Sequence, residues 1–64
     1  MKFRIDVFTW DNPHEAASQH DITYHKTKAE AMEYGKSQRA DNKAVFLLRK
    51  AYGEKYDVVS KIGR

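Results

Sequence analysis

The chain has 64 residues, of which 33% are charged and 41% hydrophobic, with a formal net charge of +3 and no cysteine. This length predicts one domain, residues 1–64, that buries only about 60% of the surface exposed by its unfolded chain. The lack of cysteine excludes disulfides and thiolate metal sites. No apolar run approaches the roughly 18 residues of a membrane span, and the N-terminus lacks the pattern of a signal peptide. We therefore expect a soluble cytoplasmic protein with no membrane contact.

The charge is uneven along the sequence. Residues 1–25 carry two basic and four acidic groups, a sum of −2, whereas residues 26–64 carry ten basic and five acidic groups, a sum of +5. A basic half of this kind is compatible with an anionic partner, although many small soluble proteins share it.

Residues 2–10 are predicted to form the first strand, because polar and apolar side chains alternate and several are aromatic or β-branched. One face of this strand presents Phe3, Ile5 and Val7, and the other presents Lys2, Arg4, Asp6, Phe8 and Trp10. The sequence Asp11-Asn12-Pro13 ends the strand. Residues 13–18 then form either one short helical turn or a mobile loop.

Residues 22–25 are predicted to form a second, short strand that leads directly into a helix over residues 27–42. Thr27 and Glu30 have the spacing of a capping box, in which each side chain accepts a hydrogen bond from the backbone N–H of the other residue. Asp41-Asn42 provides the expected stop, because short polar side chains tolerate the left-handed conformation at a helix end.

The predicted helix has a narrow face of small residues. Ala31, Met32 and Gly35 lie together at the helical period, so the helix backbone can approach a sheet closely. Glu30 and Glu33 lie opposite, toward solvent.

Two more strands follow the helix, over residues 44–48 and 56–62, joined by a turn at residues 52–55. A right-handed crossover from the second strand to the third leaves room for the first strand between them. The sequence therefore predicts an α+β fold, a ββαββ antiparallel sheet of order 2-1-3-4 with one helix on one face.

One helix covers only one face of such a sheet, and the other face is expected to be apolar. If the helix packs on Ile5 and its neighbours, Phe8 and Trp10 emerge on the far side. The third strand adds either the pair Val45 and Leu47 or the pair Phe46 and Leu48, and Val59 is a further candidate. An exposed apolar patch of this kind marks a binding site or an oligomer interface.

Several alternatives account for this apolar face. The loop at residues 11–20 could fold over it, two copies could pair through it as a homodimer, or another macromolecule could bind to it. The edge of the second strand offers a separate route, because it could accept a strand from a partner.

No catalytic, cofactor or metal site is predicted, so we do not expect an enzyme. His14, His20 and His25 lie near Asp11 and Asp21, but their spacing fits no standard metal-ligand pattern. The serines have no glycine elbow around them, and the isolated glycines form no phosphate-binding loop.

The basic and aromatic residues give a stronger indication of function, namely the binding of a partner. Arg4, Phe8 and Trp10 on an open sheet face resemble, loosely, the aromatic platforms of RNA-recognition sheets. Sequence-specific binding to a nucleic-acid duplex is disfavoured, because Glu30 and Glu33 on the exposed helix face would repel phosphate. The predicted partner-binding residues are Arg4, Phe8, Trp10, Lys28, Arg39, Arg49 and Lys50.

The layout resembles that of small phage-encoded inhibitors, including some anti-CRISPR proteins and phage inhibitors of host RNA polymerase. The shared features are the alternating strand Lys2–Trp10, the Thr-capped helix beginning Thr27-Lys28-Ala29-Glu30-Ala31, and the hairpin Ala44–Ile62. The resemblance implies a stoichiometric inhibitor or adaptor that docks on a protein or nucleoprotein complex and has no catalytic residues. The alternatives are a single-stranded nucleic-acid-binding module that uses Arg4, Phe8, Trp10, Arg49 and Lys50, and a structural homodimer.

Overall fold

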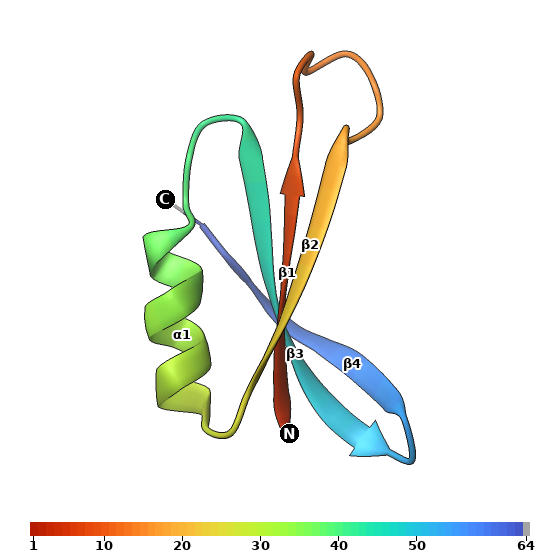
Figure 1. Cartoon of the computed structure of the whole chain (residues 1–64), viewed down its shortest axis with the longest axis vertical. Helices are drawn as coiled ribbons and strands as arrows, with labels where there is room; N and C mark the ends of the chain where they lie inside the picture. Colours follow the sequence, from red (N-terminus) through yellow and green to blue (C-terminus); the bar gives the residue numbers. More distant parts are fainter. Residues whose placement is uncertain (64) are drawn as a thin grey trace.

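The computed structural model describes residues 1–63. They fold into four antiparallel strands, one helix and the loops that connect them (Figure 1). In chain order the elements are β1 (Phe3–Thr9), β2 (Gln19–His25), α1 (Lys28–Ser37), β3 (Lys43–Tyr52) and β4 (Lys55–Ile62). The sheet order is β2-β1-β3-β4, and every neighbouring pair is antiparallel. The predicted α+β fold and its strand order are confirmed. Within residues 1–63, α1 falls short of the length and apolarity that a membrane crossing requires.

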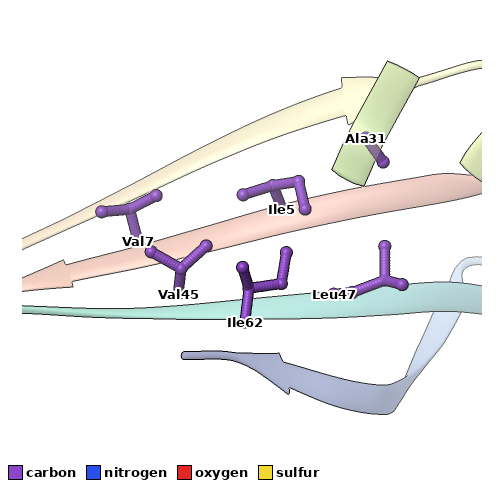
Figure 2. Close-up of a cluster of buried hydrophobic side chains, with 6 residues drawn as sticks. All are labelled: Ile5, Val7, Ala31, Val45, Leu47 and Ile62. Carbon is purple, nitrogen blue, oxygen red and sulfur yellow. The ribbon is translucent and has the colours of Figure 1, made fainter. Parts of the chain in front are cut away.

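The core lies between α1 and the side of the sheet that carries the odd-numbered residues of β1 and β3. Its buried side chains are Ile5, Val7, Ala31, Val45, Leu47 and Ile62 (Figure 2). Because Val45 and Leu47 belong to this core, the alternation of β3 sends Phe46 and Leu48 to the other side. This settles the choice that the sequence left open.

The buried face of α1 follows the sequence pattern, and one of the two hydrogen bonds of the predicted capping box forms at its start. The Thr27 side chain accepts a hydrogen bond of 3.2 Å from the backbone N–H of Glu30, which satisfies one free donor at the helix start. Ala31 and Gly35 are buried against the sheet. A Cβ at Gly35 would collide with the end of the Ile62 side chain and press on Ile5, so a larger residue there would force these side chains to shift, and glycine suits the close approach of helix and sheet.

The predicted helix end at residues 41–42 is wrong, because α1 ends at Ser37. The Ser37 hydroxyl donates to the Tyr34 carbonyl, and the N–H of Gln38 turns back to the carbonyl of Gly35, which tightens the last turn. Since β3 already begins at Lys43, the five residues between the two elements are needed to reverse the chain.

The connection between β1 and β2 contains a turn and no helix, so the helical alternative for residues 13–18 is wrong. Asn12 closes the turn by accepting two backbone N–H groups, that of His14 on its side chain and that of Glu15 on its carbonyl. Ser18 donates its N–H and its hydroxyl to the Thr9 carbonyl, which begins the pairing of the two strands. The pairing makes β2 longer than predicted.

The β3–β4 hairpin turns at Gly53, whose φ of 58° lies in the left-handed region that glycine adopts readily. Farther along, Leu47 pairs with Ser60 but Leu48 pairs with Val58, so Val59 is an extra residue in a β-bulge. The bulge changes the alternation of β4. The sequence had suggested that Val59 lies on the far side of the sheet, but the bulge places Val58 there instead.

Candidate docking face on the sheet

The side of the sheet opposite α1 carries the candidate site, and we call it the helix-free face. Its residues come from all four strands, and α1 is the only helix within residues 1–63. They include Arg4, Asp6, Phe8, His20, Ile22, Tyr24, Phe46, Leu48, Tyr56 and Val58. The loop between β1 and β2 does not cover them, because residues 11–16 are exposed and the loop extends past the strand ends (Figure 1).

A buried ionic group occupies the centre of this face. Asp6 is only 5% exposed, although it lies on the uncovered side of the sheet. Arg4 binds both of its carboxylate oxygens, with Nε 2.7 Å from Oδ1 and Nη2 2.9 Å from Oδ2. His20 Nε2 lies 3.2 Å from Oδ2. Bidentate, charge-assisted bonds of this kind fix side-chain geometry, so the centre of the face is rigid.

Aromatic rings surround one end of the ionic group. The Phe8 ring stacks on His20 at 4.1 Å between centroids, and Phe46 meets Phe8 edge-on at 5.9 Å. Trp10 lies just beyond the end of β1 and is tilted against Phe8 at 6.4 Å. The backbone N–H of Trp10 donates to the carbonyl of Asn42, which holds Trp10 at the rim of the face.

Two tyrosines converge at the other end, although they belong to the two edge strands. The rings of Tyr24 and Tyr56 are 5.9 Å apart, and the Arg4 guanidinium carbon lies 5.2 Å from the centre of the Tyr56 ring. Tyr24 is 52% exposed, so its ring is accessible from solvent.

An open hollow of about 310 Å³ lies between the two aromatic ends. Phe8, Phe46, Leu48 and Val58 supply its apolar walls, and Arg4 and Asp6 supply its polar part. Leu48 is only 5% exposed, whereas Val58 is 65% exposed. The hollow therefore offers an apolar surface beside a fixed ion pair, which suits a protruding side chain of a partner.

The structure brings together only some of the predicted partner-binding residues. Arg4 and Phe8 lie on the helix-free face, Trp10 lies at its rim, and Lys50 extends it at the end of β3. The other three, namely Lys28, Arg39 and Arg49, lie on the side of α1. Arg39 donates to the carbonyls of Lys36 and Gly63, so its guanidinium links the end of the helix to the residue that follows β4.

Sequence reasoning missed His20, because β2 was predicted too short, and it assigned no face to Ile22 and Tyr24, which lie inside the predicted strand. Once β2 is taken to begin at Gln19, strand alternation alone places these three side chains on one face. Tyr56 and Val58 could not be placed in this way, since their side depends on the bulge at Val59.

The side chains of His, Asp and Glu within residues 1–63 include no group of three or more that could hold a metal ion. No protein-family model, curated protein or solved structure matches the chain.

Proposed function

We propose that this protein is a non-catalytic binding protein that docks on a protein or nucleoprotein assembly through its helix-free face. One observation carries the proposal: apolar and aromatic side chains from all four strands lie on a side of the sheet that α1 does not cover. Ile22 and Val58 are 42% and 65% exposed there. Exposed apolar side chains that gather on one side of a molecule are costly in water and are typical of interaction sites.

The construction of the face supports the same function. Its side chains stand on strands, and the Arg4–Asp6–His20 group locks the centre before any partner arrives. A rigid surface loses little conformational entropy on binding, which favours affinity. The resemblance of the layout to small phage-encoded inhibitors would make such a binder a stoichiometric blocker of its partner.

Site-specific photocrosslinking in the native cells tests the proposal. A photoreactive phenylalanine analogue replaces Val58 on the helix-free face in one variant and Glu33 on the exposed side of α1 in a matched control. We expect Val58 to give a discrete covalent adduct with one macromolecule and Glu33 to give none. Adding Ile22→Asp should remove the Val58 adduct, because a carboxylate on the apolar surface opposes docking, whereas adding Lys36→Ala should not.

Three results would contradict this function. They are no adduct at Val58, equal adducts from both sides of the molecule, or an adduct that persists unchanged with Ile22→Asp.

A further inference from the structure

Three lysines form a row at the tyrosine end of the helix-free face. The N–H of Lys50 donates to the Lys2 carbonyl at 2.8 Å, so these two residues lie side by side on β3 and at the start of β1. Lys26 follows His25, which pairs with Phe3, and so lies one step beyond β2 beside Lys2. All three line one open hollow of about 450 Å³. We call Lys2, Lys26 and Lys50 the lysine row.

The lysine row carries concentrated positive charge without a carboxylate partner. Asp6 forms an ion pair with Arg4 and a contact with His20, and neither includes a member of the row. Like charges on directly adjacent strands repel, so this arrangement costs stability in the free protein.

The acidic residues are placed so that they do not relieve this repulsion. The chain has nine, and all of them lie within residues 1–63, but Asp6 is the one on the helix-free face. Arg4 already occupies both of its oxygens. The others lie on α1, in connections or at strand positions facing the other side, as Asp21 and Asp57 do. The lysine row is thus kept apart from the acidic residues of the chain, and it presents a surface suited to an anion.

Two tyrosine rings lie directly beside the lysine row, and that of Tyr24 is exposed. Tyr56 pairs with Lys50 across the β3–β4 hairpin, and its hydroxyl donates to the Met1 carbonyl. Tyr24 comes two residues before Lys26 on the same side of β2, and its ring meets that of Tyr56 at 5.9 Å. Neighbouring strands are about 4.8 Å apart, so the row spans about 10 Å beside the paired rings.

We propose that the lysine row and the Tyr24–Tyr56 pair bind single-stranded nucleic acid, with phosphates on the lysines and a base on the exposed Tyr24 ring. This inference rests on the proposed docking function and names the partner class at one end of that face. Basic groups that follow a backbone, beside aromatic rings that stack on bases, are the two components of sequence-tolerant single-strand binding. The proposed site differs from the one suggested by the sequence, since Arg4 is held by Asp6 and His20 covers Phe8.

A duplex fits this surface less well than a single strand. The bases of a duplex are stacked on one another and cannot reach a tyrosine ring without being unstacked. An acidic protein surface would satisfy the lysines but would make no use of the exposed ring of Tyr24. The presence of both components side by side therefore favours a single strand.

Fluorescence anisotropy of a labelled, mixed-sequence single-stranded DNA oligonucleotide tests the proposal with the full chain. Three lysine–phosphate contacts predict a salt slope near −2, so affinity should fall roughly fifteen- to twentyfold between about 50 and 200 mM salt. Lys50→Gln should weaken binding and reduce the slope by about 0.7. Lys36→Gln on α1 removes the same charge elsewhere and should leave both quantities nearly unchanged.

Tyr24→Leu tests the stacking component, because it keeps an apolar side chain but removes the ring. We expect it to weaken single-strand binding by about fivefold or more while the salt slope stays the same. A circular dichroism spectrum and a urea transition for each variant show whether it is folded. His25→Leu, on the opposite side of the same strand, is the matched control and should have little effect on binding.

Four outcomes would overturn the proposal. They are no binding to the oligonucleotide, equal losses from Lys36→Gln and Lys50→Gln, duplex binding as tight as single-strand binding, and equal competition by polyglutamate. The last would indicate an acidic protein as the partner. A protein adduct at Val58 with no oligonucleotide binding would reject this inference and keep the proposed docking function, whereas the absence of any adduct would reject the docking function itself.

Discussion

Asp6 stands out among individual residues, because a carboxylate that is 5% exposed lies on the side of the sheet without a helix. Isolated charges are rarely buried, and this one is compensated by Arg4 and approached by His20. The three side chains come from neighbouring strands, so the group also fixes their relative positions on the helix-free face. The ion pair therefore serves stability and the shape of the surface together.

Replacing Asp6 by Asn tests this role. The variant keeps the shape of the side chain but leaves the Arg4 guanidinium without its carboxylate, and we expect a loss of about 2–3 kcal/mol in the free energy of unfolding. Urea denaturation measures the loss. Asp21→Asn is the matched control, because Asp21 is exposed on the neighbouring strand, and its effect should stay within about 0.5 kcal/mol. Equal effects of the two substitutions would show that the Asp6 pair contributes no more than a surface charge.

Among the elements, the β3–β4 hairpin depends on a single glycine. Gly53 has a φ of 58°, and a Cβ added there would meet no atom within 4 Å. Any cost of Gly53→Ala is therefore conformational and not steric, and we expect about 1 kcal/mol of destabilisation in urea unfolding. Gly53→Asn should cost less, because asparagine tolerates this conformation. Gly63→Ala has equal space and no left-handed φ, so a loss as large as that of Gly53→Ala would contradict this explanation.

Local sequence patterns predicted that each element exists. The prediction of an element's length failed where that length depends on a distant element. Period two identified β1, an apolar run identified β3, the turn at residues 52–55 placed β4 after it, and the Thr27–Glu30 spacing identified the start of α1. The end of α1 was missed, because it is set by where β3 must begin. The seven-residue length of β2 was missed, because its first residues pair with β1 and carry no strand signal of their own.

The candidate site was less predictable than the fold for the same reason. Arg4, Phe8 and the apolar surplus followed from alternation within one strand. The contact of Asp6 with His20 depends on the register of two strands, and the position of Val58 depends on a bulge. Neither the register nor the bulge is encoded in a local pattern. The lysine row likewise combines residues that lie far apart in the sequence and meet only in the folded sheet.

The distribution of charge over the whole molecule disfavours a face that pairs with itself. In a twofold dimer, the same surface patch meets its copy. Pairing two helix-free faces would cover both lysine rows without offering them a carboxylate, because Asp6 is already bound to Arg4. Covering unpaired ammonium groups is costly, and repulsion between the faces is strongest at low salt.

We therefore expect the protein to remain a monomer at low ionic strength, with the helix-free face open to solvent. Sedimentation equilibrium at several protein concentrations measures this directly, and the fitted mass should stay at 7.5 kDa. If the lysines oppose pairing of the apolar surface, a variant with Lys2, Lys26 and Lys50 all replaced by Gln should associate more than the parent. The matched control replaces Lys28, Lys36 and Lys43 by Gln and removes equal charge away from the row. If the fitted mass of the unsubstituted protein rises with concentration at low salt, a second copy of the chain covers the apolar face. The face would then be a dimer interface.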